Sequence, residues 1–120
     1  MNKLTDLRRN QLVWVDFGSN VGSEQNGIRP AIVVQNDKGN KFSSTTIVVP
    51  ITSQNKTKLP THVKLSKTSQ LVKPSVALCE QVKVISKERI VKTGALISDE
   101  DSVKIDNAVL ISMGFVPANL

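Results

Sequence analysis

Short β-branched runs bounded by turn residues fill most of this 120-residue chain, and they constrain its fold more than any other feature. Valine, isoleucine and threonine pack well on a pleated surface, so such runs predict strands. We expect strands at residues 12–17, 31–35, 45–52, 61–65, 75–84 and 92–97, with a short helical turn at 86–89. The pattern is therefore one of many short strands followed by a single late helix.

Two local features indicate how these strands connect. Residues 36–40 are dense in turn formers and should reverse the chain between two antiparallel strands. Pro50 lies inside an expected strand and cannot donate to a ladder, which indicates a strand edge or a bulge. Either would redirect the chain just before Thr52.

The clearest single element is a late helix that begins after Ser98. A serine cap followed by acidic residues suits the positive end of a helix dipole. The first turn holds Asp99, Glu100 and Asp101; one mostly apolar stripe holds Ile105, Ala108, Val109, Ser112 and Met113; Gly114 and Pro117 end the helix. These acids have a structural explanation, so we assign them no catalytic role. The architecture predicted is one domain, residues 1–120, with a small, strongly bent antiparallel barrel or sheet and one packed helix.

The charge distribution points to an anionic partner. Residues 38–92 carry eleven basic and two acidic side chains, within a chain whose net charge is +6. A basic middle favours a polyanion or an acidic protein, although lysines also protect exposed strand edges. Aromatic residues are few, so base stacking on a broad platform is not expected. A nucleic acid would be held mainly through its phosphates, hydrogen bonds and groove shape.

Cysteine content and the lack of long apolar segments indicate the cellular compartment. Its single cysteine, Cys79, lies in an apolar run, which favours a buried thiol in a reducing compartment. The first residues lack the apolar stretch of a signal peptide, and no apolar run reaches membrane-spanning length. We therefore expect a cytoplasmic protein with no membrane association.

The segment GSEQNGIRPAIVVQND at residues 22–37 narrows the function most. Gly22 and Gly27 permit a loop that lies close to a ligand, and Pro30 biases Arg29 toward an extended conformation at the rim of a sheet. A guanidinium delivered there suits bidentate phosphate recognition. The alternative is a surface turn with a solvated arginine.

Several catalytic arrangements are excluded by composition. His62 is the chain's one histidine, so it cannot supply the acid–base pair of pancreatic-type ribonucleases, and a hydrogen-bonded strand residue is the simpler interpretation. No Cys/His cluster has zinc spacing, and adjacent acids on a helix point apart. We expect no metal and no cofactor.

Three segments together resemble the MazF/PemK family of toxin ribonucleases: GSEQNGIRPAIVVQNDKGNKFSSTTIVVPITS, LPTHVKL and ALCEQVKVISKERI. The resemblance spans roughly residues 10–115. It implies an SH3-like barrel of the kind shared by MazF and CcdB toxins, and a sequence-selective, metal-independent endoribonuclease that cleaves mRNA. It also implies a homodimer with single-stranded RNA along the interface, and an antitoxin whose acidic tail occupies the same groove.

The resemblance also assigns site residues. Arg29 and Thr52 match the family's active-site arginine and threonine, and Glu24 matches a loop acid that acts either as base or as a loop-ordering group. RNA-binding candidates are Ser23, Gln25, Asn26, Ser53, Gln54 and Gln81. Asn26, Ile28 and Trp14 depart from the commonest family pattern, and these differences bear on base preference more than on catalysis.

Two other functions stay open on the sequence alone. A CcdB-like poison of DNA gyrase would use the same scaffold without cleaving RNA, since a fold does not determine a function. A non-catalytic SH3-like binding module is the third possibility. The Arg29–Thr52 pair favours the nuclease, because a gyrase binder has no use for it.

Overall fold

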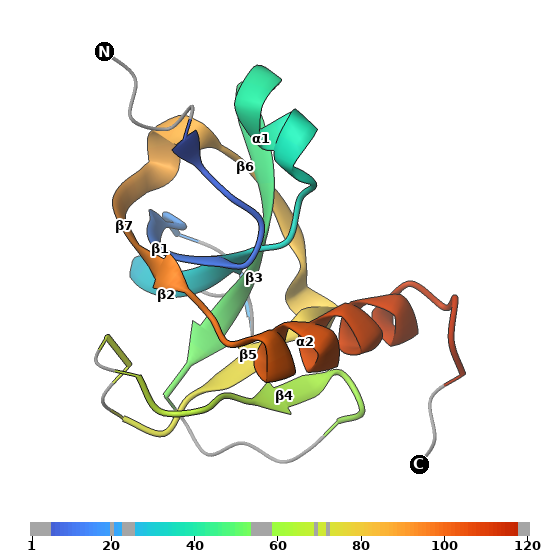
Figure 1. The fold of residues 1–120 in the computed structure, drawn as a ribbon. Coiled ribbons are helices and arrows are strands. Elements are labelled where there is room, and N and C mark those ends of the chain that lie inside the picture. Colours follow the sequence, from blue (N-terminus) through green and yellow to red (C-terminus); the bar gives the residue numbers. More distant parts are fainter. Residues whose placement is uncertain are drawn as a thin grey trace.

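The computed structural model describes residues 6–19, 21–22, 26–53, 59–68, 70–71 and 73–117. Figure 1 shows short, strongly curved strands wrapped around one another, with one long helix lying along a side of the sheet. The strands are β1 (Gln11–Asp16), β2 (Ile28–Val33), β3 (Thr45–Thr52), β4 (His62–Lys64), β5 (Val76–Leu78), β6 (Lys83–Ser86) and β7 (Ile90–Leu96). The helices are α1 (Asp37–Phe42) and α2 (Asp99–Ser112), with 3₁₀ turns at Cys79–Gln81 and Lys87–Arg89.

All strand pairs are antiparallel and belong to one seven-stranded sheet. Its order is β4-β5-β3-β2-β1-β7, and β6 pairs with β3 beside this path. β3 is the central strand: β2 lies on one side, and the other side is shared by β6 along Thr45–Val48 and by β5 at Ile51 and Thr52. The prediction of a mainly β, bent antiparallel fold with a C-terminal helix is confirmed.

Pro50 lies in this central strand, so the prediction of an edge strand is wrong. It faces Ala31 of β2 and is buried, and on its other side the ladder with β6 has ended while that with β5 has not begun. A residue without an N–H costs no ladder bond where β3 changes partners. The strand is therefore redirected by a change of neighbour.

Residues 36–40 form the start of a helix instead of a simple turn. The side chain of Asn36 caps α1 by accepting from the backbone N–H of Gly39, because asparagine serves helix caps as readily as turns. The chain still reverses between β2 and β3, as expected. The single strand expected at 75–84 is interrupted by the 3₁₀ turn Cys79–Gln81, which divides it into β5 and β6.

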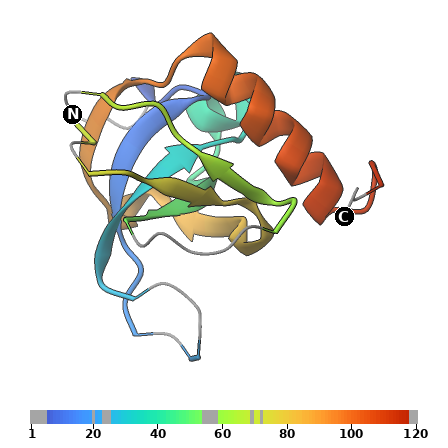
Figure 2. The same cartoon turned by 90° about the horizontal axis from the view of Figure 1, so that it is seen from below.

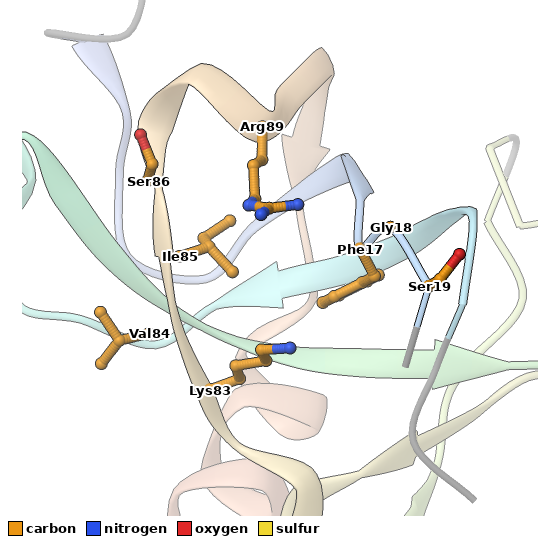
Figure 3. A pocket seen from close by; sticks show the side chains of 8 residues that line it. All are labelled: Phe17, Gly18, Ser19, Lys83, Val84, Ile85, Ser86 and Arg89. Atoms are coloured by element: carbon orange, nitrogen blue, oxygen red, sulfur yellow. The ribbon is translucent and has the colours of Figure 1, made fainter. Parts of the chain in front are cut away.

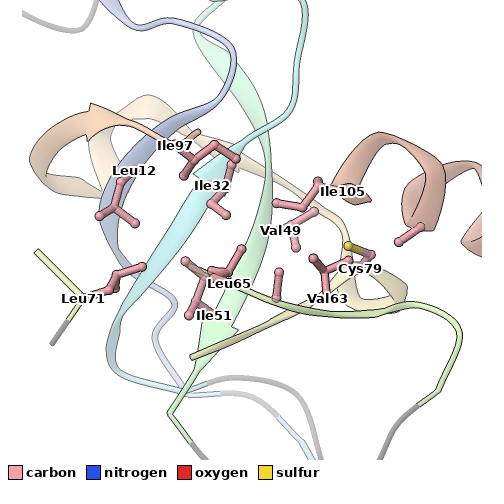
Figure 4. Packing of buried hydrophobic residues seen from close by; sticks show 12 residues of the cluster. Leu12, Ile32, Val49, Ile51, Val63, Leu65, Leu71, Cys79, Ile97 and Ile105 are labelled. Carbon is pink, nitrogen blue, oxygen red and sulfur yellow. The ribbon is translucent and has the colours of Figure 1, made fainter. Parts of the chain in front are cut away.

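The core consists of two apolar clusters on opposite faces of the central strands. One lies between the sheet and α2 and contains Leu12, Ile32, Val49, Ile51, Val63, Leu65, Leu71, Ala77, Cys79, Ile97, Ile105 and Ala108 (Figure 4). The other contains Leu7, Val13, Val15, Phe17, Ala31, Val33, Val48, Ile85 and Ile90. Alternate residues of β1, β2 and β3 enter different clusters, as the two-residue period of a strand requires.

Helix α2 begins where the sequence predicts. Ser98 caps it by accepting from the backbone N–H of Asp101, and Gly114 adopts a φ of +81° just beyond its end. Asp101 is buried and accepts from the backbone N–H and the hydroxyl of Ser66, at 3.0 and 3.2 Å. The structural explanation of this acid is confirmed. Neither α1 nor α2, the helices among the described residues, could cross a membrane.

Candidate nucleic-acid interface

Arg29 is the second residue of β2, the cyan strand that runs beside β1, in blue, in Figure 2. It faces Val15 of β1 and is exposed. Its Nε donates to the backbone carbonyl of Asn26 at 3.0 Å. The guanidinium is thus held at its base by the chain that precedes it, and it is carried by a strand instead of a free loop.

Thr52 is the last residue of β3 and is half-buried. The ladder between β2 and β3 pairs Val33 with Val48 and ends at Ala31 and Pro50. The same register continued by two positions sets Arg29 opposite Thr52. Directly opposed residues in an antiparallel pair project from the same face, so both belong to the face that carries Val33 and Val48.

The remaining predicted site residues fall into two groups. Asn26 and Ser53 are exposed and flank the ends of β2 and β3, and Gln81 is half-buried in the 3₁₀ turn that follows β5. Ser23, Glu24, Gln25 and Gln54 lie outside the described residues, so their roles stay predictions.

His62 is a hydrogen-bonded strand residue, as predicted. Its Nε2 lies 3.1 Å from Oε2 of Glu80, and its Nδ1 accepts from the backbone N–H of Leu59 at 3.3 Å. Oε1 of the same glutamate accepts from the hydroxyl of Thr61 at 3.0 Å. These contacts connect β4 to the turn that carries Gln81, so the imidazole of His62 has a structural role.

Cys79 is fully buried, as predicted, and its thiol is a poor nucleophile. Burial, and after it the charges of Glu80 and Asp106, raise the pKa of the Cys79 thiol from 9.0 to about 12. The reactive form of cysteine is the thiolate, which such an environment suppresses. Among the described residues, no three His, Cys, Asp or Glu side chains gather where they could hold a metal ion.

The structure brings together a basic pocket that the sequence did not single out. Lys83 and Arg89 line it with Phe17, from three separate segments of the chain (Figure 3). The excess of lysine and arginine in residues 38–92 was the available signal. It could not identify which cations meet, because their meeting depends on how β6 and the chain after β1 approach each other.

Comparisons with known proteins agree on one family. The model of the "PemK-like, MazF-like toxin of type II toxin-antitoxin system" family matches residues 8–113. Endoribonuclease MazF of Staphylococcus saprophyticus is 43% identical over 110 residues, which cover 90% of this chain and 92% of that protein.

Solved structures share the fold. MazF from Deinococcus radiodurans superposes with a TM-score of 0.78 at 24% identity, covering 90% of this chain and 96% of its own. An endoribonuclease in complex with its cognate antitoxin, from a mycobacterial species, gives 0.78 at 19% identity, covering 92% and 97%.

The fold is therefore that of the small, curved antiparallel-sheet proteins to which these endoribonucleases belong. The family match over most of the chain, together with the relative that is 43% identical over 110 residues, makes the assignment specific. The chain belongs to the PemK-like, MazF-like toxins of type II toxin–antitoxin systems. The resemblance read from the three sequence segments is confirmed.

Proposed function

We propose that this toxin cleaves single-stranded RNA, including mRNA, at selected sequences and without a metal ion, by directing the RNA's own 2′-hydroxyl against the adjacent phosphate. Family membership and the 43% identical endoribonuclease support the activity. The observation that supports the mechanism is the β2–β3 register, which sets Arg29 opposite Thr52 when continued by two positions.

The reaction balances without any co-reactant. The 2′-oxygen forms a bond to phosphorus as its proton leaves, and the bond from phosphorus to the 5′-oxygen breaks as that oxygen gains a proton. The products are a 2′,3′-cyclic phosphate and a 5′-hydroxyl. What the protein must provide is in-line positioning and stabilisation of the charge that develops on the phosphate oxygens.

Arg29 and Thr52 suit these two tasks. A guanidinium stays charged and bonds two phosphate oxygens at once, which makes Arg29 an electrostatic stabiliser first and a proton donor second. The hydroxyl of Thr52 holds the phosphate and helps to place the nucleophile. Glu24 either removes the 2′-proton or orders the loop by a hydrogen bond, and the two roles are separated by a pH–rate profile.

RNA sequence would be read around this centre by polar side chains. Asn26 and Ser53 are exposed beside the ends of β2 and β3, and Gln81 lies on the neighbouring turn. Their amide and hydroxyl groups offer donors and acceptors to base edges of an unpaired strand. Ser23, Gln25 and Gln54 complete the proposed set.

The gyrase-poison alternative is not favoured. The family model and the curated relative both describe MazF proteins, and the relative is named an endoribonuclease.

We also infer that the toxin acts in the cytoplasm as a homodimer, neutralised by an antitoxin with an acidic tail. A mycobacterial endoribonuclease with its cognate antitoxin and a MazE–MazF structure from Deinococcus radiodurans support the antitoxin. Apolar surface for a second copy is present in a groove of about 400 Å³ beside α2. It is lined by Arg9, Val34, Ile47, Val82, Asp106, Val109, Leu110 and Met113.

Digestion of a long single-stranded RNA in excess EDTA tests the mechanism. We expect cleavage to persist, and the fragments to accept a phosphate from polynucleotide kinase at their 5′ ends without prior dephosphorylation. Activity that disappears on chelation and returns with magnesium would defeat the proposal, as would 5′-phosphate ends. Sequencing the 5′ ends of the same fragments identifies the recognised RNA word.

A further inference from the structure

The pocket between β6, the turn Lys87–Arg89 and the chain that follows β1 carries its own chemistry. It has a volume of about 260 Å³. Its lining combines two cations and two hydroxyl groups over an apolar floor: Lys83 and Arg89, Ser19 and Ser86, and Phe17 with Ile85. Figure 3 shows the Arg89 and Lys83 side chains entering the space between β6 and the Phe17–Ser19 segment.

Both cations are held in place by neighbours that do not neutralise them. The Nζ of Lys83 lies 5.9 Å from the centre of the Phe17 ring, and Nη1 of Arg89 donates to the backbone carbonyl of Asp16 at 3.1 Å. The Asp16 carboxylate accepts from the backbone N–H of Gly18 at 2.9 Å, and Glu88 is exposed on the adjoining turn. The described lining residues themselves include no acid, so the cavity favours an anion.

The group expected in the pocket is a phosphate of a nucleic acid, not one of its bases. Phe17 as a whole is only 4% exposed, so its ring offers no face on which a base could stack. A planar guanidinium beside an ammonium and two hydroxyls is the donor set that phosphate oxygens require.

The pocket lies on the same face of the sheet as Arg29 and Thr52. Lys83 pairs with Val48 of β3, and Thr52 lies four positions after Val48, an even offset, so the three share one face. The distance along β3 from Val48 to Thr52 is roughly 13 Å at about 3.3 Å per residue. At the pocket's wall, the N–H of Phe17 and the carbonyl of Gly18 bond Gly27, two residues before Arg29.

We propose that the Lys83–Arg89 pocket binds a second backbone phosphate of the RNA substrate, away from the phosphate that is cut. The inference rests on the proposed function, because it takes the strand that passes Arg29 and Thr52 to continue across the same face. The site would add affinity without reading bases, since phosphate contacts fix register and orientation but carry no sequence information.

Salt-dependent binding tests the site separately from cleavage. The probe is a fluorescein-labelled 20-nucleotide strand of mixed sequence made wholly of 2′-O-methyl nucleotides, which cannot undergo 2′-hydroxyl attack. Its affinity is measured by anisotropy from 50 to 200 mM NaCl. Each phosphate contact on a single strand adds about 0.7 to the slope of log K against log salt. Lys83→Gln should lower the slope by that amount and weaken binding severalfold at 50 mM.

Lys92→Gln is the matched control. Lys92 is an exposed lysine over the Trp14 ring, at 4.5 Å, and Trp14 lies one residue from Val13 and Val15, on the opposite face of β1. We expect this variant to keep the wild-type slope, and Lys83→Arg to keep it too, with all variants melting within a few degrees of one another.

An unchanged slope in Lys83→Gln, or an equal loss in Lys92→Gln, would overturn the proposal. So would a Lys83→Gln protein that binds the RNA normally but loses affinity for a glutamate-rich peptide, since the pocket would then serve an acidic protein. If wild-type protein fails to cleave natural RNA while the slopes behave as expected, the proposed function falls and the phosphate site stands.

Discussion

At the residue scale, the proposed chemistry depends on two side chains that separate strands bring to one sheet face. The sequence was sufficient to identify Arg29 and Thr52 as candidates, because Pro30 fixes the backbone beside Arg29 and the run 45–52 ends at Thr52. That both belong to one face was not readable, because it depends on the β2–β3 register. A shift of one residue would send one of them to the other face.

Arg29→Ala and Thr52→Ala should each reduce RNA cleavage by about 10²–10³, the usual effect of removing one preorganised charge-stabilising donor. Neither residue is part of the buried core, so the fold should persist. Arg29→Lys should recover little activity, because a point charge does not reproduce bidentate geometry. Initial rates are compared at matched fractions of folded protein.

His62→Ala is the control for this series. Its contacts with Glu80 and Leu59 are structural, so the variant should lose stability but keep substantial activity below its melting temperature. An inactive but folded His62→Ala protein, beside an Arg29→Ala protein that still cleaves, would mean that the active site has been assigned to the wrong residues.

Cys79 should make the free energy of unfolding fall above pH 9. Its thiol pKa is 9.0 in the reference state and about 12 in the fold, so between these values the unfolded chain loses a proton that the native state keeps. Stability from this group is complete below pH 9 and declines as pH rises toward 12. Urea unfolding of wild type and Cys79→Ala at pH 7, 9 and 10 checks this, and parallel pH dependence in the two proteins would refute it.

At the element scale, α1 shows why local sequence was insufficient. Asn36, Asp37 and Gly39 are turn formers, yet Asn40 is fully buried and ties the helix to the start of β3. Its backbone carbonyl also accepts from Nζ of Lys87, 47 residues along the chain. Its Oδ1 accepts from Thr46 Oγ1 at 2.7 Å and from Gln35 Nε2 at 3.1 Å, and its Nδ2 donates to the Gln35 carbonyl at 2.9 Å. These buried bonds, together with the long-range one from Lys87, favour the helix over a bare turn.

Asn36, which caps α1, and Asn40, which lies inside it, should therefore contribute differently to the free energy of unfolding. Asn36→Ala removes a cap and should cost about 1 kcal/mol. Asn40→Ala removes the partner of the buried Thr46 hydroxyl and of the Gln35 carbonyl, and should cost about 3 kcal/mol, at roughly 1–3 kcal/mol for each orphaned group. Urea unfolding measures both, and equal losses would contradict the network's role.

At the scale of the whole molecule, fold class was predictable but strand order was not. Alternation and turn residues gave the strands, and the cap and apolar stripe gave α2 within a residue or two. The sharing of β3 between β5 and β6 follows from side-chain packing across distant segments, which no local pattern encodes. The same dependence on distant neighbours explains why the Lys83–Arg89 pocket was not foreseen.

The side chains that line the groove beside α2 should become buried when a second copy of the chain binds there. Leu110→Lys places a charge in that groove and should convert the dimer to monomer in sedimentation velocity at micromolar concentration. Val103→Lys alters an equally apolar, 67% exposed residue of the same helix that is not among the groove's lining residues, and should leave the dimer intact. A wild-type monomer, or loss of the dimer in both variants, would contradict this assignment.

A single modified substrate distinguishes attack by the RNA's own 2′-hydroxyl from attack by an external nucleophile. Once the cleaved RNA word is known, a strand carrying that word is made with a single deoxynucleotide on the 5′ side of the scissile phosphate. It should compete for the protein as well as the all-ribose strand and remain uncut, because the nucleophile has been removed while the phosphates are unchanged. Efficient cleavage of that strand would show that an external nucleophile attacks, and would contradict the mechanism built on Arg29 and Thr52.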